Sequence, residues 1–434
     1  MSSPMGKYFG TLLLILSNYF FANSDPVIWS GIGYFVDSGK TSSTYPNLTS
    51  LEKDLNLARL ISDKFSGNEN IIIGGSGNIS SDEGFNSVLL AITSEKIFSN
   101  YRGKNPLDDS HLCYRTYLLG SQVVLYSLND KKILKAFPST TKKTFIDGDD
   151  KQACKNSTVS LNLHKARFAD ILWGSDFAKI GVGSNFTSNY NSENLETSGM
   201  LQEQMEKILT LKNVFAKGNQ PIGVRQVSVS EYANNQLTGK GDFSPHQDYI
   251  SESGLNLKEL KEWLGAEFSK WLTQDLKISI VPFYEGEGLT LNIGTTFSNS
   301  AEALNLKKPE LSYGFDYVLR GFRKVDVGET QTQKGSVWSV YSGIKFGVVL
   351  GEEPEDIKTL ATIPFTQSTA EQYNKTDIIN DWDNFDETAQ VGIREISQNL
   401  IKQNKNWMKE SSEISSKEFR NFAKTILSKV GYEK

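Results

Sequence analysis

The chain has 434 residues, of which 38% are hydrophobic, 11% aromatic and 22% charged, and its formal net charge is −5. This length is too great for one ordinary core, so we expect two or three domains of a folded protein. The composition excludes a disordered or fibrous chain, and the negative balance argues against a basic nucleic-acid-binding surface.

The first 24 residues have the pattern of an export signal. An apolar run extends from Tyr8 to Phe21, and small residues at Ala22 and Ser24 precede the expected cleavage point. The alternatives are a buried helix or a membrane anchor, but the run is shorter than the ~20 residues that a span needs. We therefore expect a signal peptide over 1–24 and a mature protein that begins at Asp25, secreted to the periplasm or the cell surface.

The mature chain contains two cysteines, Cys113 and Cys154. An exported chain with an even number of cysteines can pair them in an oxidising compartment. Such a bridge would close a loop of about 40 residues and stabilise the protein by roughly 4 kcal/mol, less any strain. The alternative is a pair of buried thiols. We predict a Cys113–Cys154 disulfide bond.

The first part of the mature chain, 25–216, is predicted to be an N-terminal α+β domain. Patterns of period two and period 3.6 indicate the following elements in order: a strand at 27–36, a helix at 51–65, a strand at 70–74, a helix at 85–98, a hairpin at 115–137, and helices at 161–173 and 200–215. A polar junction at 217–221 marks the expected boundary.

The second part, 217–380, is predicted to be a C-terminal α+β domain. Its expected elements are a strand at 222–229, a helix at 255–272, strands at 278–284 and 289–297, a long hairpin at 311–350 and a return strand at 359–365. The segment 381–434 adds C-terminal helices at 388–407 and 416–430, whose charges indicate a partly solvated pair. The fold class is therefore α+β, with two tandem mixed domains and a C-terminal helical pair.

The hairpin at 311–350 is the strongest pattern in the sequence. Apolar residues occupy mostly odd positions from Leu311 to Val325 and mostly even positions from Trp338 to Leu350. Each strand of about 15 residues is longer than the usual five or six. Its apolar side needs a cover, and the helix at 255–272 carries large apolar residues. We expect that helix to cover the hairpin and the loop at 326–335 to project.

The two halves resemble each other. Residues 120–138, GSQVVLYSLNDKKILKAFP, form a strand, a polar turn and a return strand that ends at a proline, and 343–364 repeat that order. In both halves these hairpins follow a strand, a helix and another strand. The order predicts an internal repeat.

This order of elements resembles the small α/β domain shared by the N-terminal part of TolB and by the curli secretion channel protein. The resemblance covers residues 27–137 and 222–365 and is carried by the order of elements and by phrases such as GSQVVLYSLNDKKILKAFP. It implies an assembly or transport factor of the bacterial envelope without chemistry of its own. It carries no functional residue over to this chain, because no diagnostic motif accompanies it.

Two glycine-containing segments have some features of anion-binding sites. Residues 33–41, GYFVDSGKT, end like a phosphate-binding loop, but Gly33 lies one position too early and Pro46 follows where a helix should start. Gly74–Gly77 could point backbone amides at an anion, yet they lack the G-x-S-x-G order of a nucleophile turn. A tight turn is the simpler interpretation, so we predict no nucleotide and no other cofactor.

Candidate catalytic and metal-binding residues do not cluster in the sequence. The three histidines, His111, His164 and His246, are isolated from one another. Two acidic groups could meet calcium, namely Asp147, Asp149 and Asp150, and Asp381, Asp383, Asp386 and Glu387. The second group lacks the turn glycine and the bidentate acid of a calcium loop. We therefore predict no catalytic residue and no metal ligand.

The sequence favours an exported, non-enzymatic binding or assembly factor of the bacterial cell envelope, with a protein partner and without nucleic acid. One alternative is a component of an outer-membrane pore that inserts the hairpin at 311–350, since each strand exceeds the 9 to 11 residues needed to cross a bilayer. Four charges disfavour membrane association, namely Arg320, Arg323, Lys324 and Lys345, because charges on a lipid-facing side are costly, although charges on the lumen side cost little. A second alternative is a secreted hydrolase whose site is assembled from residues distant in sequence.

Overall fold

The computed structural model describes most of the chain from Val27 to Val430. The described residues are 27–35, 41–55, 57–65, 71–73, 86–105, 107–127, 129–156, 160–173, 199–210, 221–240, 256–276, 278–281, 289–294, 303–306, 309–351, 355–375 and 381–430, with the single residues 67, 249, 283, 353 and 379. The predicted export signal at 1–24 lies outside them.

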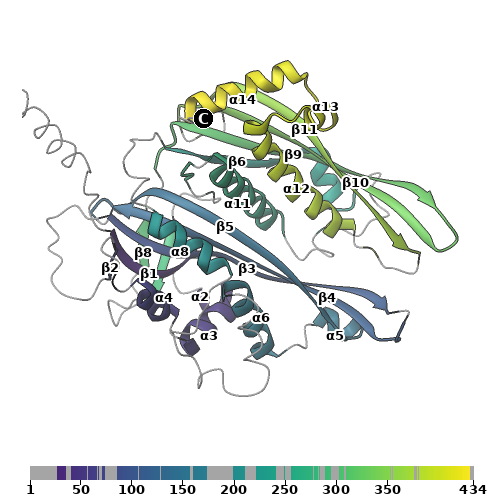
Figure 1. The fold of residues 1–434 in the computed structure, drawn as a ribbon, viewed down its shortest axis with the longest axis horizontal. Helices are drawn as coiled ribbons and strands as arrows, with labels where there is room; N and C mark the ends of the chain where they lie inside the picture. The colour runs from purple at the N-terminus through teal and green to yellow at the C-terminus, as the bar shows by residue number, and fades with distance from the viewer. Residues whose placement is uncertain are drawn as a thin grey trace, which may run out of the picture.

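Two β-sheets form the frame of the α+β fold (Figure 1). Sheet A has the strand order β5-β4-β3-β1-β7-β8, with β2 also paired to β1. Its strands are β1 (Val27–Phe35), β2 (Ile71–Ile73), β3 (Asn86–Lys104), β4 (His111–Ser127), β5 (Lys132–Asp147), β7 (Leu289–Gly294) and β8 (Ala303–Leu306). Sheet B has the order β11-β10-β9-β6, from β6 (Ile222–Val229), β9 (Tyr313–Glu329), β10 (Gln333–Val349) and β11 (Ile357–Asn374).

Helices cover the sheets in layers (Figure 1). They are α2 (Thr41–Thr44), α3 (Pro46–Leu55), α4 (Leu57–Phe65), α5 (Lys151–Asn156), α6 (Leu161–Trp173), α8 (Met200–Thr210), α9 (Glu231–Leu237), α11 (Leu257–Leu276), α12 (Asp381–Lys402), α13 (Lys405–Glu410) and α14 (Ser416–Val430). The helices α3, α4, α6 and α8 share a core with one face of sheet A, whereas α11, α12 and α14 share a core with one face of sheet B. No helix in the described part of the chain is long and apolar enough to cross a membrane.

The two sheets share one topology, as the internal repeat predicts. In sheet A, β1 runs parallel to β3, which opens an antiparallel meander of β3, β4 and β5. In sheet B, β6 runs parallel to β9, which opens the meander of β9, β10 and β11. Both parallel pairs and both first meander pairs contain a register shift. The likeness therefore extends from the order of elements to the pairing of strands.

One segment of the second half belongs to sheet A. The strand β7 pairs antiparallel with β1, with Gly33 opposite Ile293, and β8 continues the sheet. This pairing covers the edge of β1 that β3 leaves open, so its backbone groups gain hydrogen-bond partners. The two halves of the sequence therefore do not correspond one to one with the two sheets, because β7 and β8 of the second half belong to sheet A.

Some predicted elements are wrong. Most of the loop predicted at 326–335 belongs to the strands, because β9 continues to Glu329 and β10 begins at Gln333. The segment predicted as a helix at 85–98 is part of β3. Its apolar residues alternate between the two faces of sheet A, with Val88 and Leu90 on one side and Leu89 on the other. A strand that is buried on both faces has a continuous apolar run, which cannot be told from a helix by periodicity. Of the strand predicted at 278–284, the described residues 278–281 and 283 contain one bridge, between Gly223 and Val281.

The predicted hairpin and its helical cover are confirmed. The strands β9 and β10 pair over almost their whole length, and the ring of Phe268 in α11 lies edge-on to Phe315, with 5.6 Å between centroids. The cover is larger than expected, because Trp382 of α12 also packs on Phe322. A register shift at Arg320 explains why Phe322, an even position, points to the core.

The helix α11 also touches sheet A and so lies between the two sheets (Figure 1). The ammonium group of Lys270 donates a 2.7 Å hydrogen bond to the carbonyl oxygen of Thr140 in β5. At its N-terminal end, Glu259 forms an ion pair with Lys96 of β3. Leu118 of β4 joins the core that α11 shares with sheet B. The helix α11 therefore packs against both sheets.

Candidate functional site

The far ends of the two meanders form two arms at the same end of the molecule (Figure 1). Arm A consists of residues 98–104, 111–117 and 141–147, from β3, β4 and β5. Arm B consists of residues 323–335 and 366–374, from β9, β10 and β11. The repeat makes the arms topological equivalents, but their surroundings differ.

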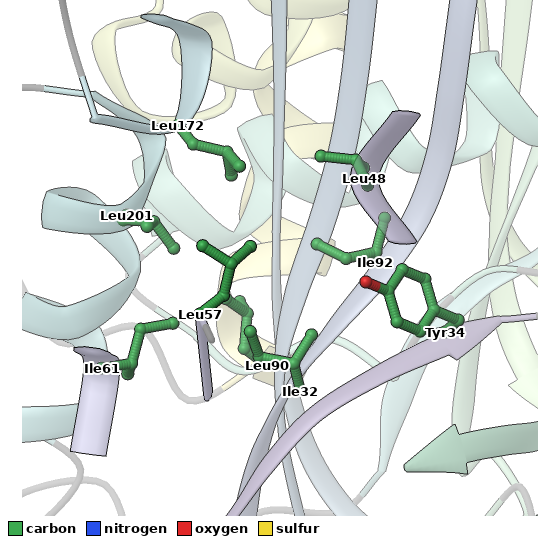
Figure 2. A pocket seen from close by; sticks show the side chains of 9 residues that line it. All are labelled: Ile32, Tyr34, Leu48, Leu57, Ile61, Leu90, Ile92, Leu172 and Leu201. Carbon is green, nitrogen blue, oxygen red and sulfur yellow. The ribbon is translucent and has the colours of Figure 1, made fainter. Parts of the chain in front are cut away.

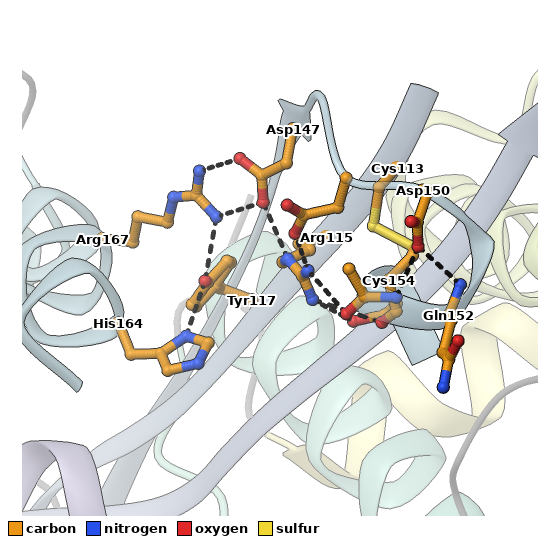
Figure 3. Close-up of polar contacts among 12 residues, drawn as sticks. Cys113, Arg115, Tyr117, Asp147, Asp150, Gln152, Cys154, His164 and Arg167 are labelled. Carbon is orange, nitrogen blue, oxygen red and sulfur yellow. Dashed lines mark hydrogen bonds and ion pairs between the residues drawn. A yellow bond between two sulfur atoms is a disulfide. The ribbon is translucent and has the colours of Figure 1, made fainter. Parts of the chain in front are cut away.

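Arm A is fastened by the predicted disulfide, which the structure confirms (Figure 3). Cys113 of β4 and Cys154 of α5 are joined, with 5.7 Å between their Cα atoms, and both are fully buried. Asp150 immediately precedes the short helix α5, and its carboxylate accepts hydrogen bonds from the backbone amides of Gln152 and Ala153, each at 2.9 Å. The bridge holds this helix against the strands.

A buried arginine completes the fastening of arm A. The guanidinium of Arg115 has no exposed surface, and it donates to Asp147 at 2.8 Å, to Asp149, and to the carbonyl oxygen of Cys154 at 3.3 Å. Ser99 accepts a further bond at 3.0 Å. These contacts satisfy the charge, as a buried arginine requires.

A second arginine, Arg167 of α6, binds the same carboxylate, that of Asp147 (Figure 3). Arg167 donates two hydrogen bonds to Asp147 and one to the hydroxyl of Tyr117, and its guanidinium lies 4.7 Å from the centre of the Phe145 ring. Burial alone would raise the pKa of Asp147, but the hydrogen bonds from the two arginines outweigh it and lower that pKa. Burial, followed by the two arginines, lowers the pKa of His164.

This network is balanced in charge. Two guanidinium groups, from Arg115 and Arg167, face two carboxylates, from Asp147 and Asp149. His164 makes a 2.8 Å hydrogen bond with the hydroxyl of Tyr117. The arrangement therefore stabilises the arm and offers no spare charge for a ligand.

The remaining candidates from the sequence are dispersed. His111 is bonded to Tyr101 on the tip of arm A at 2.7 Å, and His246 and Gly74–Gly77 lie outside the described residues. Asp381 accepts from Trp338 and pairs with Lys324, both at 2.9 Å. Within the described ranges, no three His, Cys, Asp or Glu side chains converge as a metal site would require.

A small apolar cavity lies between sheet A and its helices (Figure 2). Its volume is about 10 Å³, and leucine and isoleucine side chains line it together with Tyr34. Ligand pockets usually enclose about 300–1,000 Å³. A cavity of this size and polarity is a packing gap and not a binding site.

Arm B has no disulfide, no covering helix at its tip and no buried arginine among its described residues. Val325 is 38% exposed and Val327 60% exposed. The turn between the strands is closed by a 2.8 Å hydrogen bond from the amide of Thr330 to the carbonyl of Gln333. Lys334 pairs with Asp326 at 2.8 Å across the two strands. This arm is an ordered three-stranded ribbon with exposed apolar and charged side chains.

The root of arm B is rigid. Trp338 is fully buried and donates its indole N–H to Asp381 in the first turn of α12. A carboxylate in that position is favoured by the helix dipole. Ser336, also buried, bonds to Asp326 at 2.7 Å and to the hydroxyl of Tyr373 at 2.9 Å. The arm therefore projects from a buried and hydrogen-bonded base.

The two arginines of this network, Arg115 in arm A and Arg167 in α6, were not identified from the sequence. The available signal was Arg115, a charged residue between Cys113 and Tyr117 on the side of a predicted strand that those residues mark as buried. A buried arginine needs acids nearby, and the run Asp147–Asp150 lies close to the other cysteine. Taken together, these residues would have predicted an ion-pair network for Asp147 and Asp149.

Comparisons with known proteins add no identity to this picture. No protein-family model and no curated protein matches the chain.

Proposed function

We propose that this chain is an exported, non-enzymatic binding or assembly factor of the bacterial cell envelope, and that arm B is the surface that holds its protein partner. The observation that carries the proposal is the contrast between equivalent arms. Arm A is closed by a disulfide and a balanced ion network. Arm B keeps the same framework but presents Val325 and Val327 to solvent.

The chemistry of arm B suits an extended protein segment. The strand β11 is the last strand of sheet B, so beyond the bridge at Phe365 no described strand pairs with its outer edge. An open edge can accept a further strand through backbone hydrogen bonds, while side-chain contacts supply specificity. The exposed valines add an apolar contact, and the charged pairs of the arm form a polar rim.

Two observations support the exported setting. The pattern of residues 1–24 is typical of a signal peptide. The Cys113–Cys154 bridge fits an oxidising compartment such as the periplasm.

The pore alternative has less support. The apolar side of the hairpin is occupied, since Phe315, Trp338 and Phe346 are fully buried beneath α11 and α12. Inserting the hairpin into a bilayer would require those helices to leave it. In the described residues, the Nδ1 atoms of His111 and His164 are hydrogen-bonded to tyrosine hydroxyls, and these contacts do not favour the hydrolase alternative.

A photo-crosslinking experiment tests the proposal. A photoreactive amino acid is placed at Val327 in the full chain, in its native cells, and at Leu350 as the control, since Leu350 is 69% exposed but lies at the other end of β10. We expect a discrete protein adduct from position 327 and none from 350. The adduct should disappear when Val325→Asp is combined with the probe. Adducts of equal yield at both positions, or none at 327, would overturn the assignment of arm B.

A further inference from the structure

The chain itself already adds a short segment to the outer edge of β11. Residues 411–413, which follow α13, lie on this edge at the root of arm B. The amide of Thr366 donates a 2.8 Å hydrogen bond to the carbonyl oxygen of Ser411, and the amide of Glu413 donates a 3.2 Å bond to the carbonyl oxygen of Pro364. The two bonds flank an antiparallel bridge. The edge of β11 is therefore able to pair with an antiparallel strand.

Beyond this segment, towards the tip of the arm, alternate residues of β11 direct their backbone groups outwards. Successive residues of a strand point their N–H and C=O groups to opposite sides. The register of β11 with β10 has no shift between Thr366 and the end of the strand. Ser368, Ala370 and Gln372 consequently share the outward direction of Thr366. In the described part of the chain one contact reaches these groups, a 3.3 Å bond from the side-chain amide of Gln367 to the carbonyl oxygen of Ser368.

A row of apolar side chains crosses arm B and ends at this edge. The register places Val325 beside Val337, and Val337 beside Ala370. The row lies on the face of the arm opposite α12, because Trp338, the next residue of β10, belongs to the core that α12 shares. A strand added beside β11 would place one side chain in the same row, opposite Ala370. An apolar residue is favoured there, because directly opposed side chains on neighbouring strands contact each other.

The other face of the edge presents an acid. Glu371 is exposed and lies on the side of β11 from which Thr369 bonds to Thr388 of α12. The other acids of arm B, Asp326 and Glu329, form ion pairs with lysines, whereas among the described residues Glu371 has no ion pair. A cation directly opposite Glu371 on an added strand would form a favourable cross-strand pair. The edge therefore favours a basic residue next to an apolar one.

We propose that the outer edge of β11 over 368–374 binds an extended protein segment as a further strand of sheet B. The segment runs antiparallel to β11, as 411–413 does, with an apolar side chain opposite Ala370 and a lysine or arginine opposite Glu371. The open stretch has the length of an ordinary strand. Because 411–413 occupies the edge at the root, the C-terminal end of the bound segment lies towards the root. This inference rests on the proposed function, since it specifies how the partner binds arm B.

A synthetic peptide tests the strand addition on the purified mature protein. The probe is Thr-Tyr-Thr-Lys-Val-Thr-Thr with blocked ends, which places its valine opposite Ala370 and its lysine opposite Glu371. We expect saturable binding with a Kd below about 1 mM, followed by fluorescence anisotropy of a labelled peptide. N-methylation of the valine should weaken binding about tenfold or more, because that N–H faces β11. N-methylation of the lysine is the matched control and should leave binding unchanged, because its N–H points away.

Substitutions on the edge supply the second arm of the test. Ala370→Pro removes an outward N–H that the ladder with β10 does not use, and Pro364 already occupies an outward position of the same strand. We expect this variant to bind the peptide about tenfold more weakly or worse, and the control Ala370→Thr, which keeps the N–H, to bind it normally. Glu371→Lys should weaken binding of the lysine peptide and strengthen binding of a peptide with glutamate in that place. Circular dichroism and urea unfolding establish that the variants are folded.

The outcomes separate this inference from the proposed function. Absence of saturable binding at about 1 mM peptide, or equal binding by Ala370→Pro and Ala370→Thr, would overturn the strand addition. In cells, an adduct from position 327 that persists with Ala370→Pro would retain arm B as the partner surface and refute pairing with β11. Conversely, specific binding of the peptide without any adduct from position 327 would retain the edge as a strand-binding site and refute the proposed function.

Discussion

At the residue scale, Arg115 stabilises arm A through its buried hydrogen bonds. Its guanidinium is fully buried and is bonded to Asp147, Asp149 and two main-chain carbonyls. A buried cation is tolerated only when its hydrogen-bonding groups are matched, so the acids and the arginine depend on one another. Removing either the arginine or the acids should therefore destabilise the folded protein.

We expect Arg115→Met to lower the free energy of unfolding by about 3 to 5 kcal/mol, because it removes the buried cation that pairs with Asp149 and leaves Asp147 with Arg167 alone. Arg320→Met is the control: its ion pair with Glu413 is largely exposed, and such pairs contribute about 0 to 1 kcal/mol. Urea unfolding followed by tryptophan fluorescence measures both. Losses of similar size would mean that the network of arm A is dispensable.

Asp386 should make stability depend on pH. Burial raises its pKa to about 7, although Lys142 and the hydroxyl of Tyr249 act in the opposite direction. The unfolded chain has the ordinary value near 3.9, so between about pH 4 and pH 7 the folded protein holds a proton that the unfolded chain has released. The free energy of unfolding should therefore fall as the pH rises through this window.

The variant Asp386→Asn isolates that contribution. Because the side chain is only partly buried, the change should stay below the roughly 4 kcal/mol that the full shift in pKa would give. We expect the variant to gain stability relative to the wild type between pH 4.5 and pH 8, as measured by urea unfolding at several pH values. A constant difference across that range would show that Asp386 does not titrate there.

At the scale of elements, a strand could be predicted from the sequence when only one of its faces is buried. The hairpin of β9 and β10 was predictable because one face is buried and the other is not, so the apolar period is visible in residues such as Trp338 and Val340. The strand β3 was not, because Val88 and Leu89 are buried on opposite faces. The short pairing of Val281 with Gly223 depends on a distant strand and has no local signal.

The same helical cover gives a prediction for α11. Phe268 is fully buried and its ring contacts Phe315 and Tyr317, so Phe268→Ala should leave a cavity and lower the free energy of unfolding by about 3 to 5 kcal/mol. Thr332→Ala, in the exposed turn of arm B, should change it by less than about 0.5 kcal/mol. Chemical denaturation of both variants provides the comparison, and equal, small changes would contradict the role of α11.

At the scale of the whole molecule, the repeat was predictable but its interlocking was not. The order of strands and helices in each half could be inferred from 120–138 and 343–364. The pairing of β7 with β1, and the position of α11 between the sheets, depend on which surfaces meet after folding. The contrast between the arms likewise became visible only when Arg115 and the disulfide were placed on one of them.

This interlocking predicts that the two sheets unfold together. The helix α11 packs Phe268 into sheet B and donates from Lys270 to Thr140 of sheet A, while β7, from the second half, completes sheet A beside β1. Opening sheet B should therefore remove contacts that sheet A needs. Under conditions in which exchange requires cooperative opening, Phe268→Ala should speed amide hydrogen exchange in β4 and β5 by a factor similar to that in β9 and β10.

The experiment is hydrogen exchange with mass spectrometry on the full mature chain, comparing wild type and Phe268→Ala in peptides from the two sheets. Arg115→Met supplies the reciprocal comparison, because it perturbs sheet A directly and should accelerate exchange in sheet B through the same coupling. If each substitution accelerated exchange only in its own sheet, the halves would be independent domains. In that case α11 and β7 would form surface contacts between two domains. The face of sheet A that α11 contacts would then be a domain interface and not part of one shared core.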